Sequence, residues 1–203
     1  MQIDRAVRGT ARPPALPSWQ ARWPGWAVVV WGVLFAVPSF VWALGSTAGA
    51  RSTVAPDLVR LAVDRVPWFL AVLWITGALK LVGALIGLGL SRPRGVRAGR
   101  LLAFCGGGAA VLTGWHGGLF IVHGVLVEAG SVAVAPDLLG LTRWYLYLWG
   151  PWFVAGALAF AGATVGYVQG CGPADQRGLR RSGAVGALGA LVLSLASTVT
   201  GIG

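Results

Sequence analysis

The chain of 203 residues is 56% hydrophobic and only 11% charged, and its mean hydropathy is +0.74. Soluble domains carry about 25% charged residues, so this composition excludes an ordinary soluble fold. The net charge of +10 first suggests nucleic-acid binding, but the basic residues are scattered between apolar stretches and do not line one soluble segment. We therefore expect a membrane protein that binds the lipid bilayer and no nucleic acid.

Residues 1–22 precede the first apolar stretch and are rich in arginine and proline. The segment contains Pro13, Pro14 and Pro17 and lacks the apolar core of a cleavable signal peptide. We expect a disordered basic tail in the cytoplasm. A single transmembrane domain is expected over residues 23–203.

Five apolar stretches follow, each close to the roughly 20 residues that a helix needs to cross a bilayer. They cover about residues 26–44, 68–88, 102–126, 147–168 and 183–202. The sequence therefore predicts an all-α, polytopic membrane bundle of five transmembrane helices.

The arginines favour one side of this bundle. The richer side has Arg5, Arg8, Arg12, Arg22, Arg92, Arg94, Arg97, Arg100, Arg177, Arg180 and Arg181, and the other has Arg51, Arg60, Arg65 and Arg143. Because cytoplasmic loops carry the excess of positive charge, we expect the N-terminus inside and the C-terminus outside. The absence of Asn and the abundance of Ala, Gly, Val and Arg are typical of a high-GC bacterial genome. The expected location is a bacterial inner membrane.

The outer end of the first stretch reads Ser-Phe-Val-Trp-Ala-Leu-Gly over residues 39–45. It resembles the Phe-Tyr-Trp-Ala-Leu-Gly-Gly signature of a family of small bacterial multi-pass membrane proteins of unknown function. Val41 replaces the usual tyrosine, and Ser46 replaces the second glycine. The resemblance implies a helical membrane protein and brings no activity or site residues with it.

Lys80 lies near the middle of the second stretch, where a lysine costs about 2.5–3.5 kcal/mol unless it finds a partner or water. Pro38 donates no backbone hydrogen bond, so it leaves the carbonyl of Leu34 free at a similar depth. One hypothesis makes Lys80 part of a proton or solute path. The alternative is a lysine that reaches toward headgroups or a carbonyl.

His116 and His123 are seven residues apart in the third stretch, hence on one helical face, and Glu128 lies at its outer end. Two such histidines would approach a haem from the same side, so they cannot be the two axial ligands of one haem iron. A zinc site would need further ligands that this sequence does not supply. We expect no metal and no cofactor. The histidines form either a polar stripe that takes part in protonation or interhelical hydrogen bonds.

Residues 31–90 and 115–170 resemble each other. Val-Ala-Pro-Asp-Leu occurs at 54–58 and 134–138, and Pro-Trp-Phe occurs at 67–69 and 151–153. These matches predict a parallel duplication of a two-helix hairpin, with the fifth span outside it. Pro67 and Pro151 are expected in the first turn of their helices, and Asp57 and Asp137 at the N-caps of short interfacial helices.

Small-residue pairs suggest close helix packing, within the chain or in contacts with a second copy or another membrane protein. The pairs are Gly83 with Gly87, Gly162 with Gly166, and Gly183 with Ala187. Cys105 and Cys171 are expected to stay reduced at the cytoplasmic side.

No phosphate-binding loop, dinucleotide fingerprint, nucleophile triad or Cys-x-x-Cys motif occurs in the sequence, so we expect no enzyme and no catalytic residues. The leading hypothesis is a non-enzymatic structural or accessory component of the membrane. The alternative is a small-solute or proton-coupled transporter that uses Lys80, His116 and Pro38. An enzyme at the outer loops would require Asp57 and Asp137 to meet in one cleft with a histidine or a metal ion.

Overall fold

The computed structural model describes residues 22–200, and within that range every regular element is helical. The predicted all-α fold is confirmed. The predicted disordered tail covers residues 1–22, and all of it except Arg22 lies outside the described residues. The end of the chain at 201–203 also lies outside them.

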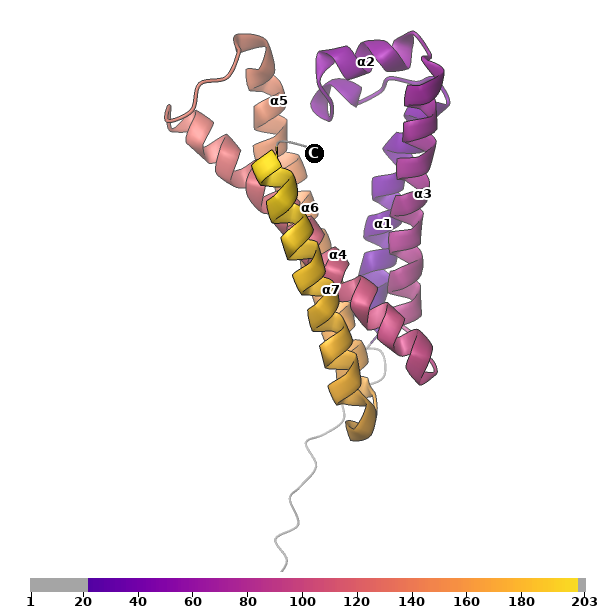
Figure 1. Cartoon of the computed structure of the whole chain (residues 1–203). Helices are drawn as coiled ribbons and strands as arrows, with labels where there is room; N and C mark the ends of the chain where they lie inside the picture. The colour runs from indigo at the N-terminus through magenta and orange to yellow at the C-terminus, as the bar shows by residue number, and fades with distance from the viewer. Residues whose placement is uncertain (1–21, 201–203) are drawn as a thin grey trace, which may run out of the picture.

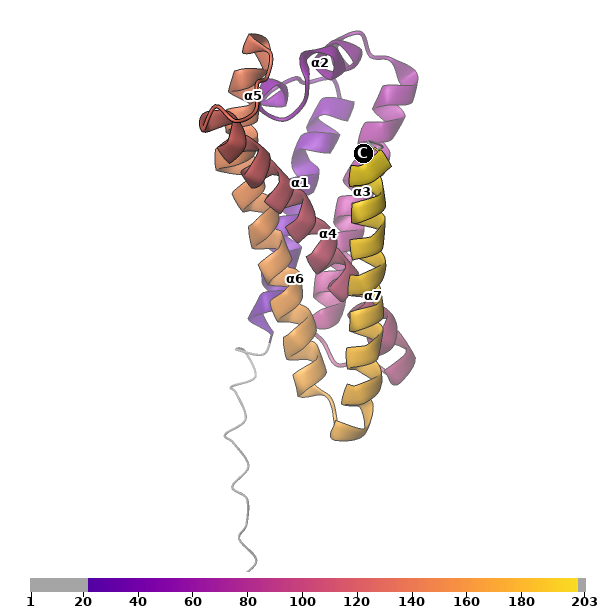
Figure 2. The ribbon, with the colours of Figure 1, turned by 60° about the vertical axis from the view of Figure 1, so that its left-hand side comes forward.

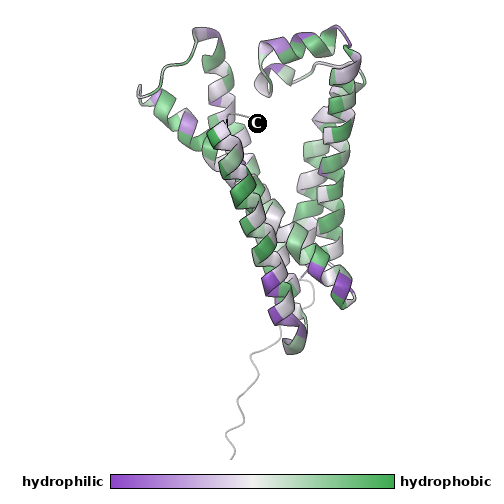
Figure 3. Ribbon diagram, in the orientation of Figure 1, coloured by the Kyte–Doolittle hydropathy of each residue, from purple (hydrophilic) through white to green (hydrophobic). Residues whose placement is uncertain are grey.

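Five helical segments of the described chain are long and apolar enough to cross a membrane. They are α1 (Trp23–Ala43), α3 (Pro67–Leu90), α4 (Val96–Glu128), the continuous run Pro136–Gly170, and α7 (Pro173–Thr200). The run Pro136–Gly170 consists of η2 (Pro136–Leu138), α5 (Leu139–Trp144), η3 (Tyr145–Trp149) and α6 (Gly150–Gly170). Each predicted span overlaps one of these segments. Hydrophilic residues gather toward their ends (Figure 3).

The first hairpin consists of α1 and α3, joined by η1 (Ala50–Ser52) and α2 (Pro56–Val63). The two long helices approach closely at Gly87, where an added Cβ would lie 2.6 Å from Val28 and 2.8 Å from the carbonyl oxygen of Gly25. The connection is held by Trp42, whose indole N–H donates to the carbonyl of Ala48 at 2.8 Å. Glycine is thus required in α3 for this contact.

The second hairpin consists of α4 and α6, with the α5–η3 segment leading into α6. An added Cβ at Gly117 would lie 2.8 Å from the carbonyl oxygen of Gly150 and 2.9 Å from Phe153. Helix α7 packs along α4, with Gly186 against the backbone of Phe104, and Figures 1 and 2 show the two helices side by side.

The two hairpins meet near the end where α3 turns into α4 and α6 turns into α7, which we call the arginine end. The shared core there includes Leu90 of α3, Ala103 of α4 and Phe160 of α6. At the other end, which carries α2 and α5 and is called the α2–α5 end, the hairpins diverge (Figure 1). The arginine-rich connections therefore share one end of the molecule, as the topology prediction requires.

The proposed N-caps at Asp57 and Asp137 are wrong. The N-caps of α2 and η2 are Ala55 and Ala135, and neither makes a side-chain capping bond. Proline at the first helical position starts each helix two residues earlier than predicted, because its ring presets a helical φ and its missing N–H needs no cap. Asp57 lies in the first turn of α2, where a carboxylate is favoured by the helix dipole.

Candidate functional site

Aromatic side chains from α1 and α6 pack together between the two hairpins. Phe35 and Phe153 form an edge-to-face pair with centroids 5.1 Å apart, and Trp31 contacts Phe160 edge-on at 6.0 Å. The indole N–H of Trp31 donates to the backbone carbonyl of Trp152 at 2.9 Å. This cluster joins the hairpins and forms the apolar wall of the site.

Lys80 reaches from α3 to this cluster. Its Nζ donates a hydrogen bond to Ser39 Oγ at 2.8 Å and lies 3.9 Å from the ring centroid of Phe35. Among the residues that the structure describes, no aspartate or glutamate forms an ion pair with Lys80. Its partner is thus a hydroxyl and an aromatic face, and the hydrogen bond goes to Ser39 instead of the carbonyl of Leu34.

A cavity of about 340 Å³ opens beside Lys80, and we call it the Lys80 cavity. It is lined by Trp31, Phe35, Leu79, Lys80, Gly83, Ala109, Leu112, Thr113, His116, Phe153 and Phe160. Both hairpins contribute, since the residues come from α1, α3, α4 and α6. Apart from the indole N–H of Trp31, which donates to the Trp152 carbonyl, the polar or charged groups in the lining are an ammonium, a hydroxyl and an imidazole. The lining contains no carboxylate.

His116 lies at the rim of the Lys80 cavity. Its ring contacts Phe120 at 4.6 Å and Phe153 at 4.8 Å between centroids, while its side chain stays exposed. His123 is exposed and does not line the cavity, because α4 diverges from the first hairpin toward the α2–α5 end (Figure 1). The two histidines are therefore not brought together at one site.

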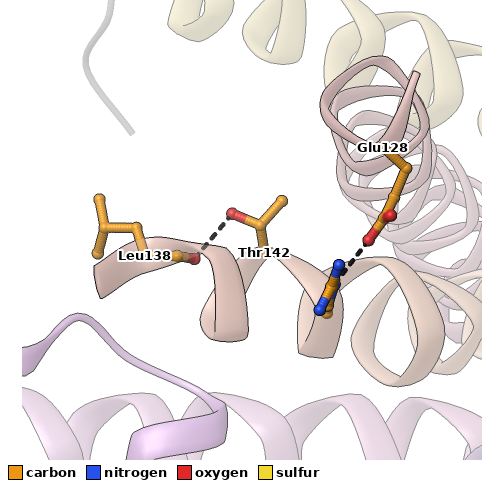
Figure 4. A network of polar contacts seen from close by, with 4 residues as sticks. Glu128, Leu138 and Thr142 are labelled. Carbon is orange, nitrogen blue, oxygen red and sulfur yellow. Dashed lines mark hydrogen bonds and ion pairs between the residues drawn. The ribbon is translucent and has the colours of Figure 1, made fainter. Parts of the chain in front are cut away.

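Glu128 lies at the end of α4 and forms an ion pair with Arg143, with 2.8 Å between Glu128 Oε1 and Arg143 Nε. Figure 4 shows this contact, together with the nearby hydrogen bond that the Thr142 hydroxyl donates to the carbonyl of Leu138. Pro38 lies inside α1 directly before Ser39, is half-buried, and does not line the cavity. Of the four predicted polar-core residues, Lys80 and His116 thus share a site.

The part of the chain that the structure describes contains no cluster of three His, Cys, Asp or Glu side chains able to hold a metal ion. Cys105 and Cys171 are free thiols. Burial, and then the charge of Asp175, raise the pKa of the Cys171 thiol, which keeps it protonated and weakly nucleophilic.

The segment that builds the cavity also matches a known family. Residues 32–160 match the family described as protein of unknown function (DUF3995), well over half of the chain. The chain belongs to the DUF3995 family. No curated protein and no solved structure matches it. The family model brings no activity with it.

The DUF3995 segment contains every residue that lines the Lys80 cavity except Trp31, and it ends before α7. Sequence reasoning missed Phe35, Ser39 and Thr113 as partners in this site. Ser39 had a readable signal, because it is a hydroxyl in the apolar interior of a span one residue after Pro38. Phe35 and Thr113 had none, since each is an ordinary residue of a membrane helix.

Proposed function

We propose that this protein is a small-solute transporter of the bacterial inner membrane that carries small organic anions, with Lys80 as the anion-binding group. The observation that supports this proposal is a cavity between the two hairpins that presents a lysine without a carboxylate partner. His116 is proposed to meet the solute at the rim and to take part in any coupled proton movement.

The charge of Lys80 determines the class of solute. An ammonium has three N–H donors, and Ser39 accepts one of them while the face of Phe35 partly balances the charge. A charged group at this depth is costly without a counter-charge. An anion in the cavity supplies that counter-charge, whereas a cation would be repelled and would find no carboxylate in the lining.

The size and walls of the Lys80 cavity restrict the solute further. A volume of about 340 Å³ lies near the lower end of the range of about 300–1,000 Å³ that is usual for ligand pockets. Most of the wall is aromatic or aliphatic, so it favours an apolar body over a sugar or a multiply charged metabolite. A small monoanion with a short apolar or aromatic body fits both conditions.

The proposal retains the predicted membrane topology, with the N-terminus inside, the C-terminus outside and a parallel duplication of the hairpin. It includes no chemical step, so the protein is not proposed to be an enzyme. A structural or accessory role remains the second candidate. It receives less support because small-residue faces already hold the chain's own helices, as Gly87 does against Val28 and Gly183 does against the carbonyl of Ala103.

The test is flux into proteoliposomes that contain the full chain. The probes are radiolabelled methanesulfonate and benzenesulfonate, which stay ionised, with choline as the cationic comparison and an entrapped pH dye to follow protons. We expect sulfonate uptake above that of empty liposomes and no choline uptake. Lys80→Met should reduce sulfonate uptake at least about tenfold, because a hydrogen bond to a charged group contributes about 1.5–3 kcal/mol.

His116→Leu should give a smaller loss of uptake, because the imidazole lies at the rim of the cavity. The matched control is His123→Leu, a histidine on the same helix outside the cavity, and it should transport as the parent does. Equal rates for the parent and Lys80→Met, or uptake no faster than that of empty liposomes, would reject the transport proposal.

A further inference from the structure

A second and larger pocket lies at the α2–α5 end, far from the arginine end. Its volume is about 580 Å³, within the range of about 300–1,000 Å³ that is usual for ligand sites. It is lined by Arg51, Val54, Pro56, Val59, Arg60, Val63, Asp64, Asp137, Gly140, Leu141 and Trp144. We call it the α2–α5 pocket. Figures 1 and 2 show α2 and α5 at the same end of the long helices.

Two hydrogen bonds hold the walls of the α2–α5 pocket together. The hydroxyl of Tyr145 donates to the carbonyl of Thr53 at 2.8 Å, and the indole N–H of Trp149 donates to the carbonyl of Ser52 at 2.7 Å. Both bonds join η3 of the second hairpin to the connection of the first. The pocket is therefore assembled by the folded chain and does not depend on a ligand to bring its walls together.

The pocket presents two positive and two negative side chains. Arg60 makes an exposed ion pair with Asp57 at 3.7 Å, a contact that contributes little in water. Arg51, Asp64 and Asp137 form no ion pair with any residue that the structure describes. Four charged groups of opposite sign thus line one pocket without neutralising one another, so its charges match a ligand that carries both signs.

The apolar part of the lining indicates where such a ligand comes from. Val59, Val63, Leu141 and Trp144 line the same pocket, and the side chains of Val63 and Trp144 are 61% and 49% exposed. The pocket lies at one end of the membrane-spanning helices, the level where tryptophan meets lipid headgroups. A ligand with a charged head and an apolar tail satisfies both halves of the lining.

We propose that the α2–α5 pocket binds the headgroup of a phospholipid that carries a phosphodiester and a primary ammonium, as phosphatidylethanolamine does. Arg51 and Arg60 would hold the phosphate oxygens, because guanidinium groups match them in charge and geometry. Asp64 and Asp137 would accept hydrogen bonds from the ammonium. A choline headgroup has no N–H to donate, and an anionic glycerol headgroup leaves both aspartates without a cation.

The test is native mass spectrometry of the full chain released from detergent after incubation with an equimolar mixture of phosphatidylethanolamine, phosphatidylcholine and phosphatidylglycerol. We expect the ethanolamine lipid to be retained about tenfold more than either competitor, since the competitors lose charge-assisted hydrogen bonds to the aspartates. Soluble glycerophosphoethanolamine in excess should displace the bound lipid weakly, because it lacks acyl chains.

Variants at the exposed rim sharpen this test, because the charged side chains are exposed and their replacement spares the core. The double variant Asp64→Asn with Asp137→Asn should lose the preference for ethanolamine over glycerol headgroups. Arg51→Gln should lower retention of all three lipids. The matched control is Asp57→Asn, an aspartate of α2 outside the pocket lining, which should keep the parent's preference.

Equal retention of the three lipids by the parent, or an unchanged preference in the double aspartate variant, would overturn the proposal. If glycerophosphoethanolamine displaces the bound lipid as effectively as intact phosphatidylethanolamine does, the lipid proposal is also overturned. The pocket would then recognise a soluble solute. Lys80→Met should leave the lipid preference intact, so failure of the transport proposal is distinguishable from failure of this one.

Discussion

The two hairpins differ most where their connections at the α2–α5 end lead back into a long helix. In the first, the chain breaks after α2: Arg65 adopts a left-handed φ of +50°, and Val66 is extended with ψ of 122° before Pro67 starts α3. In the second, the helix runs from α5 through the π-helical η3 into α6, and Gly150 before Pro151 stays helical with φ and ψ of −57°. The same Pro-Trp-Phe sequence thus follows a break in one hairpin and a continuous helix in the other.

The residue before each proline explains this difference. The proline ring pushes the preceding residue out of the helical region when that residue has a side chain, as Val66 does. Gly150 has no Cβ and tolerates the helical conformation. Pro151 still lacks a backbone N–H, and its ring crowds the helical turn before it. That turn is η3, whose π-helical form is wider than an α-helical turn. The result places Tyr145 and Trp149 against the first hairpin.

The largest difference in stability should come from glycines at helix contacts. Gly87→Ala in the first hairpin and Gly117→Ala in the second should each lower the unfolding free energy by about 2–3 kcal/mol, because the new methyl group meets backbone carbonyl oxygens. Thermal unfolding in detergent, followed by circular dichroism, measures the effect.

Gly118→Ala is the matched control for these glycine variants, since an added Cβ there meets nothing within 4 Å. It should be neutral or slightly stabilising. Equal midpoints for Gly117→Ala and Gly118→Ala would show that the second hairpin does not pack as described.

A smaller effect should come from the polar contact that only the first hairpin has. Ser39→Ala should lower the free energy of unfolding by about 1–2 kcal/mol, because it removes the hydroxyl that accepts a hydrogen bond from Lys80. In the background of Lys80→Met, the same change should cost much less. A double-mutant cycle on thermal stability measures the coupling, and additive effects would mean that the two side chains do not interact.

The two hydrogen bonds that join η3 to the connection of the first hairpin should each contribute about 1 kcal/mol to the free energy of unfolding. Tyr145→Phe removes the hydroxyl that donates to the Thr53 carbonyl and should lower stability by that amount. Tyr147→Phe is the control, because Tyr147 is 69% exposed and makes no hydrogen bond to the described part of the chain. If the two variants unfold at the same temperature, the η3 segment does not tie the hairpins together.

Much of the architecture was predictable because the bilayer imposes a simple rule. Apolar runs near 20 residues must be helical, since lipid offers the backbone no hydrogen-bonding partner. That rule identified all five spanning helices. It does not describe connections, so the prediction for 134–138 placed a capping aspartate where Pro136 had already started the helix.

The candidate site was predictable only in part. Lys80 stood out because it is the single lysine of the chain and lies at the centre of a span, and His116 stood out for its depth. Hydrophobicity does not encode which helix faces meet, so it gave no reason to place His116 in the cavity and His123 outside it. The charges of the α2–α5 pocket come from two connections far apart in sequence, and no local pattern links them.

The smallest effect should come from the ion pair at the end of the second hairpin. Glu128→Gln removes the partner of Arg143, but the side chains are 36% and 62% exposed, so water and salt screen most of the attraction. We expect the unfolding midpoint to fall by no more than about 1 °C at low salt and by nothing measurable at 1 M salt. Asp57→Asn in the first hairpin should also lower the midpoint by no more than about 1 °C at low salt, because it removes the helix-dipole interaction of the carboxylate and its exposed 3.7 Å pair with Arg60, and by nothing measurable at 1 M salt. A larger fall that persists in high salt would mean that Glu128 is buried in the membrane-embedded protein, where screening is lost, and the second hairpin would then end deeper in the bilayer than the first.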